Sequence, residues 1–274
     1  MKRLGNKKKN LWRLPIALGI AAIYLVPFYI VLSVSFKRPS DQRSWWAFPN
    51  YLCLDNYLTA LKGKILQGIM NSAVITVCSV ALIVAAGALA AYPLARNNSK
   101  LNKKVQTFIL AVMMVPQLSI IVPIYALVRN LKLGSTYPGI IFLLVTFFLP
   151  LSIFIFTNFI TSIPKELDEA AAIDGCGPLR AFFDIIMPQL GPVVASVIIL
   201  TGVNCWNDFQ FSLYILQKPS ITSVTLAISS FFAQVGSNVY GAAAAAVLGV
   251  IPVTIVFLAL QKYFIKGMVD SAIK

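Results

Sequence analysis

Six long apolar runs constrain this chain more than any other feature, because each is long enough to cross a lipid bilayer. A transmembrane helix needs about 20 predominantly apolar residues, and the runs are Leu14–Phe36, Ile69–Ala95, Val105–Val128, Pro138–Ile160, Leu190–Leu216 and Gly241–Gln261. Proline lies in or beside nearly all of them, which predicts kinks. Lipid offers backbone groups no partners, so the runs must be helices rather than open strands. The sequence therefore predicts an all-α membrane protein with about six transmembrane helices.

The composition agrees with a protein that has lipid as its solvent. Charged residues make up 12% of the chain, against about 25% in soluble domains. The net charge is +14, and the basic residues flank the apolar runs. That distribution suits anionic headgroups better than a nucleic acid. We expect a multi-pass protein of the plasma membrane that contacts lipid and no nucleic acid.

The distribution of Lys and Arg predicts the direction of the helices. If the N-terminus is cytoplasmic, 15 of the 23 basic residues fall on cytoplasmic segments, as the positive-inside rule requires. The first apolar run exceeds the roughly 7–15 residues of a signal-peptide core, so we expect it to remain as a helix. We therefore predict a cytoplasmic basic tail over residues 1–13, a transmembrane domain over residues 14–261 and a cytoplasmic tail over residues 262–274.

The sequence offers few candidates for catalytic or metal chemistry. It has no histidine and four cysteines, none of them in a C-x-x-C pair. We therefore expect no catalytic residue, metal site or disulfide framework. No G-x-x-x-x-G-K-[ST] loop is present, so ATP binding through a P-loop is not expected either. These absences predict a protein that is not an enzyme and carries no cofactor of its own.

The segment between the fourth and fifth runs, Ile163–Pro192, has an unusual composition. It holds five of the nine carboxylates of a strongly basic chain and is long for a connector. Pro164 opens a first short helix, and the glycines that follow stop it and turn the chain. A second short helix ends at Pro188. Its apolar residues have helical spacing, which predicts one apolar face made of Leu179, Phe182, Phe183 and Ile186. We call this expected pair of helices the elbow.

A motif of fixed spacing runs through the elbow. It reads E-A-A-x3-G-x9-I-x-M-P and consists of Glu169, Ala170, Ala171, Gly175, Ile185 and Pro188. This motif resembles the EAA motif of ABC importer permeases, which has leucine at the position of Met187. The two side chains have similar volumes, so we expect little consequence. The resemblance implies that the elbow is a cytoplasmic coupling loop that docks on a separate ATPase subunit. The glycine would permit its sharp turn, and the alanines would permit close approach.

Two further segments resemble the carbohydrate-uptake branch of these permeases. Trp206-Asn207-Asp208-Phe209 is similar to a W-N-[DE]-F segment of that branch. Gln261–Gly267 is similar to the end of the maltose-type second permease, although Asp270 and Ser271 depart from the usual small residues. Together with the EAA motif, these segments extend the resemblance over nearly the whole chain.

The resemblance implies the permease subunit of an ATP-driven, binding-protein-dependent sugar importer. The implied partners are a second related permease, an ATPase dimer that holds ATP and Mg²⁺, and an extracytoplasmic solute-binding protein. One alternative is a permease for another solute, such as a polyol, a glycerol phosphate or an osmolyte. A second alternative is a self-contained secondary transporter, for which ionisable groups in several spans are expected. Asp208 is the only charged residue in the six runs, which argues against that alternative.

Four polar residues in the fifth run suggest a second candidate site. Thr201, Asn204, Asn207 and Asp208 recur at helical spacing and are expected to share one face. A carboxylate at membrane depth costs about 2.5–3.5 kcal/mol, so it should face water or protein. These residues are therefore candidates for a hydrated translocation path. A hydrogen bond to a partner helix, or a position at the membrane interface, would explain them equally well.

Overall fold

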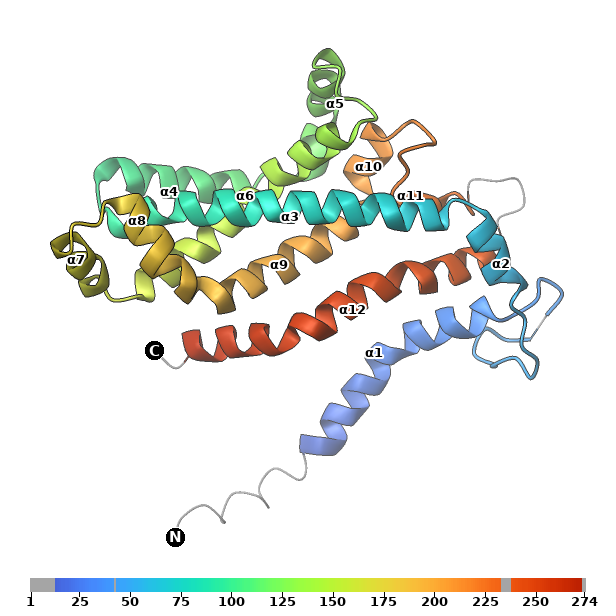
Figure 1. Ribbon diagram of the computed structural model, residues 1–274. Coiled ribbons are helices and arrows are strands. Elements are labelled where there is room, and N and C mark those ends of the chain that lie inside the picture. The colour runs from blue at the N-terminus through green and yellow to red at the C-terminus, as the bar shows by residue number, and fades with distance from the viewer. Residues whose placement is uncertain (1–12, 42, 233–237, 273–274) are drawn as a thin grey trace, which may run out of the picture. The chain divides into compact units, whose positions relative to one another are not determined.

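A computed structural model describes residues 13–41, 43–232 and 238–272, and the regular elements in these ranges are helices (Figure 1). The long helices are α1 (Arg13–Ser35), α3 (Ile65–Arg96), α6 (Tyr137–Ser162), α9 (Gly191–Trp206) and α12 (Val239–Ala272). The shorter ones are α2 (Asp55–Lys62), α4 (Lys100–Met113), α5 (Ile121–Asn130), α7 (Glu166–Ile173), α8 (Pro178–Ala181), α10 (Gln210–Ile215) and α11 (Val224–Ser229). The predicted all-α class is confirmed. Most of the predicted N-terminal tail, residues 1–12, lies outside the described residues.

Five helical segments are long and apolar enough to cross a membrane, and a bent pair of helices makes a sixth span if it is counted as one. The bent pair corrects the prediction for the third apolar run, because Val105–Val128 is not one helix. Helix α4 ends at Met113, and the chain bends by 92° before the 3-10 turn η2 (Gln117–Ile120). Pro116 accounts for the break, since proline has no amide hydrogen and disfavours a helical residue before it.

The fifth run also ends differently from the prediction. The run Leu190–Leu216 is not one helix, because α9 ends at Trp206 and α10 starts at Gln210. Asp208 accounts for the new start, since its carboxylate accepts hydrogen bonds from the amides of Phe211 (3.3 Å) and Ser212 (2.9 Å). Such side-chain caps compete with a continuing helix. The sixth run, Gly241–Gln261, agrees with the apolar span Val239–Lys262, and α12 continues beyond it to Ala272. The predicted C-terminal tail is therefore helical over its described part.

The chain divides into two compact units. One combines the residues up to Ile65 with residues 228–250, and the other combines residues 66–227 with the residues from Ile251 onward. The elbow and the four polar residues of the fifth run both belong to the second unit. The second unit therefore holds both candidate sites.

In the first unit, polar contacts hold the segment that follows α1. The buried amide of Asn56 donates hydrogen bonds to the carbonyls of Ser35 (2.9 Å) and Lys37 (2.8 Å). The carboxylate of Asp41 accepts hydrogen bonds from the guanidinium of Arg43 (2.7 Å) and the hydroxyl of Tyr51 (2.6 Å). These two donors hold the pKa of Asp41 well below its usual range.

Helix α6 is central to the second unit. Both α4 and α9 pack against it. Helix α3 approaches it at Gly87, where a Cβ would overlap the side chain of Ser152. The Ser152 hydroxyl donates a hydrogen bond to the carbonyl of Ile83 across the same contact (3.1 Å). This close packing joins α3 and α6 within both helices, and the elbow follows the end of α6.

Candidate functional site

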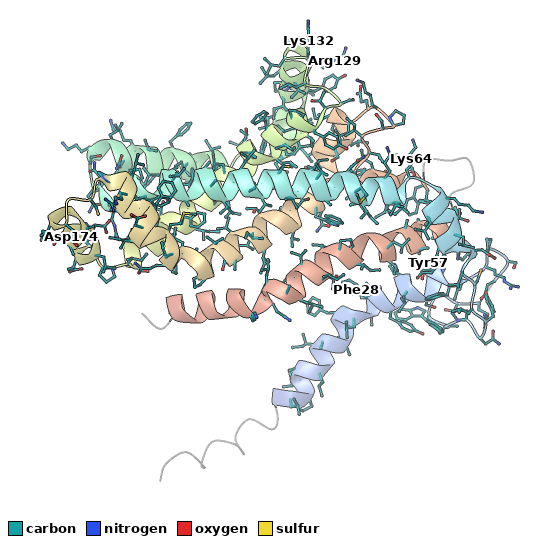
Figure 2. The ribbon with its side chains drawn as sticks, viewed as in Figure 1. Phe28, Tyr57, Lys64, Arg129, Lys132 and Asp174 are labelled. Carbon is teal, nitrogen blue, oxygen red and sulfur yellow. The ribbon has the colours of Figure 1, made fainter. Side chains whose placement is uncertain are left out.

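The elbow consists of α7 and the helical segment 178–190, which begins with α8, and a turn over residues 174–177 joins the two. In Figure 1 it lies at the end of α3 where α4 begins, whereas α10 and α11 lie near the opposite end of α3. Figure 2 shows Asp174 on the turn between its two helices. The predicted pair of short helices is thus present, and its turn is the part furthest along the chain from either membrane helix.

Local chemistry explains why α7 begins and ends where it does. Three carboxylates lie in its first turn, where the helix dipole favours negative charge. Helix α7 ends in a Schellman motif. The amide of Cys176 donates a hydrogen bond to the carbonyl of Ala171 (2.9 Å), and the amide of Gly175 donates one to the carbonyl of Ala172 (3.1 Å). The motif requires a left-handed residue, and Gly175 has φ of 78°. The predicted glycine turn is therefore confirmed in detail.

The residues of the motif do not all face the same way. Glu169, Ala170, Gly175 and Pro188 are exposed, Ile185 is half-buried, and Ala171 is buried with 2% exposure. Ala171 therefore packs inside this chain and is not available for close approach by a partner. Ala170 is the alanine of the pair that faces outward.

The predicted apolar face of the second helix is wrong in its details. Leu179 and Phe183 are exposed, whereas Phe182 and Ile186 are fully buried. The reason is that α8 is only one turn long and gives way to the π turn η3 (Phe182–Ile186) and the 3-10 turn η4 (Met187–Leu190). These turns have different periods from an α-helix. As a result, two apolar side chains anchor the elbow, and two remain on its surface.

A partly shielded ion pair links the elbow to α3, and no motif in the sequence predicts it. Nη2 of Arg96 lies 2.8 Å from Oδ2 of Asp168, and these side chains are 12% and 18% exposed. The hydroxyl of Tyr92 donates to the other oxygen of Asp168 (2.6 Å), and its ring packs on Phe182, with centroids 5.4 Å apart. The two residues are 72 positions apart, and only the folded chain shows that this arginine and this carboxylate come together. The sequence showed only a basic residue at the end of an apolar run.

The four polar residues of the fifth run do not share one face. Thr201 is buried, and its hydroxyl bonds to the carbonyl of Val197 in its own helix (2.7 Å). Asn204 is exposed and bonds to the carbonyl of Leu200 (2.7 Å). Asn207 and Asp208 lie beyond the end of α9. The expected continuous polar stripe is therefore wrong, because the helix that would carry it stops. Whether these residues line a translocation path stays a prediction.

A cavity of about 500 Å³ lies among α3, α9 and the part of α12 that belongs to the second unit. Its lining is apolar and includes Val80, Val203, Trp206 and Phe257. None of the four polar residues is part of that lining. Across the described part of the chain, no group of three His, Cys, Asp or Glu residues is placed to hold a metal ion.

Comparison with known proteins gives one consistent family. Residues 83–270 match the family model described as "Binding-protein-dependent transport system inner membrane component". The chain is 40% identical over 257 residues to the melibiose/raffinose/stachyose import permease protein MelC of Bacillus subtilis, with 93% of each chain covered. It is 35% identical over 276 residues to the multiple sugar-binding transport system permease protein MsmG of Streptococcus mutans, with 98% of this chain and 99% of that protein covered.

Solved structures show the same fold. One similar chain comes from the crystal structure of a bacterial ABC transporter involved in the import of the acidic polysaccharide alginate. The TM-score is 0.77 at 19% sequence identity, and the match covers 96% of this chain and 99% of the other.

Proposed function

Because the chain belongs to the family of binding-protein-dependent transport system inner membrane components, we propose that it is the permease subunit of an ATP-driven importer of a sugar or oligosaccharide. Its family and its membrane-spanning helices make it a multi-pass protein of the plasma membrane and not an enzyme. The substrate class is supported by MelC and MsmG, whose names specify sugars and which match nearly the full length of this chain.

The exposed surface of the elbow is the observation that carries the coupling role. Glu169 and Ala170 on α7 and Gly175 on the turn that follows it are exposed, and so are the apolar side chains of Ile173 and Leu179. An apolar patch beside polar groups is typical of a protein interface. We expect an ATPase subunit to dock here, because no P-loop is present in this chain and the energy must come from a partner that binds ATP and Mg²⁺.

Transport would follow from movement of the elbow. Closure of the ATPase dimer on ATP would displace the elbow as one body, and the membrane helices would change between inward-facing and outward-facing states. A second related permease would complete the path, and a solute-binding protein would deliver the sugar from outside. Asn204 and Asn207, which are both exposed, are the stronger path candidates among the four polar residues, since Thr201 is buried and the carboxylate of Asp208 caps α10.

Purification of the solubilised complex tests the proposal. We expect the wild type to bring down an ATPase and a second permease, and Glu169→Lys and Gly175→Trp to lose the ATPase while still entering the membrane. Asp55→Lys is the matched control, because Asp55 is also an exposed carboxylate in the first turn of an eight-residue helix. It should retain both partners.

Uptake in proteoliposomes tests the substrate class and the energy source. We expect ATP-dependent uptake of at least one of melibiose, raffinose and stachyose when the solute-binding protein is present. A chain that purifies alone and carries a sugar without ATP would be a secondary transporter. ATP-dependent uptake of glycerol phosphate or a polyol in place of these sugars would keep the importer and replace its substrate class.

A further inference from the structure

One arginine at the base of the elbow joins three helices. Nη1 of Arg96, the last residue of α3, donates hydrogen bonds to the carbonyls of Ile160 (3.0 Å) and Ile163 (2.9 Å) at the end of α6. Its Nη2 contacts Asp168 in the first turn of α7. A single guanidinium therefore touches the ends of two membrane-spanning helices and the start of the first helix of the elbow.

The charge contact with Asp168 is well shielded compared with the other ion pair in this loop. Arg180 and Asp184 are 73% and 59% exposed and lie one turn apart, so that pair joins no separate elements and contributes little. Arg96 and Asp168 are mostly covered, and their Nη2 and Oδ2 atoms have no aligned hydrogen bond. The attraction between the charges therefore holds them together, and separating them would leave two partly buried charges uncompensated.

Helix α7 has few other connections to the membrane helices. It packs mainly against α8 and η3, which are parts of the same loop. Among the described side chains of α7, Asp168 is the one that bonds to a helix outside the loop, through Arg96 and Tyr92. A displacement of α7 therefore reaches α3 and α6 through this carboxylate, beside the short chain link from α6 and the contact of Phe182 with Tyr92.

We propose that Arg96 and Asp168 form the joint that transmits movement of the elbow to α3 and α6. The inference rests on the proposed coupling function and adds to it the residues that act inside this chain, away from the ATPase surface. They are positioning residues: the ATPase still docks and hydrolyses ATP without them, but its work no longer moves the membrane helices. Arg96 belongs to α3, and its Nη2 contacts Asp168 of α7 while its Nη1 binds the carbonyls at the end of α6. A shift of α7 therefore acts on α3 and α6 together.

The test measures the ratio of sugar taken up to ATP hydrolysed by the reconstituted complex, with raffinose as the first probe. This ratio separates transmission from folding, because a lower yield of folded complex reduces both rates together. We expect Arg96→Met and Asp168→Asn each to lower the ratio about tenfold, which corresponds to about 1.4 kcal/mol. Arg43→Met and Asp41→Asn break the other partly shielded ion pair, which lies in the first unit, and should leave the ratio unchanged.

The double variant Arg96→Met/Asp168→Asn decides whether the two residues act as one unit. It leaves no unpaired charge, so it is the form expected to fold best. If the pair is a single joint, the double variant should show the same tenfold loss as either single variant. Losses that multiply, or a ratio that equals the wild-type value in complexes with a full complement of ATPase, would overturn the inference.

The two proposals fail in distinguishable ways. If wild-type complexes hydrolyse no ATP, the importer proposal fails, and if they hydrolyse ATP but take up none of the sugars, its substrate class fails. If the wild type imports raffinose, melibiose or stachyose with ATP and the Arg96 and Asp168 variants keep the wild-type ratio, only the joint is refuted. Tyr92→Phe gives a graded check, because it removes one hydrogen bond to Asp168 and keeps the charge pair. It should lower the ratio by less than Arg96→Met.

Discussion

Replacing Gly175 by alanine tests whether the turn of the elbow depends on backbone conformation. Gly175 has φ of 78°, and an added Cβ would meet nothing within 4 Å. Any cost of Gly175→Ala therefore comes from the left-handed backbone and not from a clash. An alanine in that region costs about 1–2 kcal/mol, which should raise the local opening equilibrium about 5–30-fold.

Gly177 provides a control on the same turn. A Cβ there also meets nothing within 4 Å, but its φ is −71°, which any residue adopts. We expect Gly177→Ala to change local stability by less than about 0.5 kcal/mol.

Hydrogen exchange read by mass spectrometry is the assay, because it reports the protection of the amides of Gly175 and Cys176 that close α7. Protection should fall in Gly175→Ala and stay near the wild-type value in Gly177→Ala. Equal changes in the two variants, or none in Gly175→Ala, would show that the left-handed turn is not what holds the elbow. Gly175→Asn should lie between them, since asparagine tolerates this conformation better than alanine.

Three further predictions concern other parts of the chain. Gly87→Ala should destabilise the packing of α3 on α6 by about 1–3 kcal/mol, because its Cβ would overlap Ser152, whereas Gly202→Ala, whose nearest neighbour would be 3.8 Å away, should change the thermal midpoint little. Ser99→Ala should cost about 1 kcal/mol, because its side chain caps α4 by accepting from the amide of Asn102; a thermal midpoint equal to the wild type would refute the cap. Folding lowers the pKa of Asp41, so the stability that this carboxylate contributes is complete above the usual carboxyl pKa and is lost as the pH falls through the folded pKa. Acidification below about pH 4 should therefore lower the thermal midpoint of the wild type more steeply than that of Asp41→Asn. Parallel curves of thermal midpoint against pH would contradict this.

The helices of this chain could be predicted from the sequence because their cause is local. An apolar run of about 20 residues has few alternatives to a helix in lipid, and five of the six predicted spans correspond to helices long enough to cross a membrane. The breaks at Pro116 and Asp208 were harder to place. A proline in a membrane helix leads to a kink in some proteins and a full bend in others, depending on what its neighbours satisfy. Here the bend is 92°.

In the candidate site, too, the local features could be predicted from the sequence and the long-range contacts could not. The turn at Gly175 could be predicted, because only the residues beside it determine it. The burial of Ala171 and the split of the apolar residues between Phe182 and Leu179 could not, because they depend on which neighbouring helix covers the loop. The pair of Arg96 and Asp168 had no sequence signal of its own, since a basic residue at the end of a span is equally well explained by topology.

The π turn at Phe182–Ile186 has a consequence for the rotational phase of the elbow. Each residue of an α-helix advances about 100° around the axis, and a π turn accommodates one residue more than an α turn. The π turn takes up such an extra residue, whereas deleting one residue from η4, where no π turn takes up the change, would rotate α8 by about 100° relative to α9. Leu179 would then point in a new direction although no residue of the motif had changed. The orientation of the surface that meets a partner therefore depends on how many residues the chain holds between the turn and the membrane, and a one-residue deletion there should be more disruptive than most substitutions.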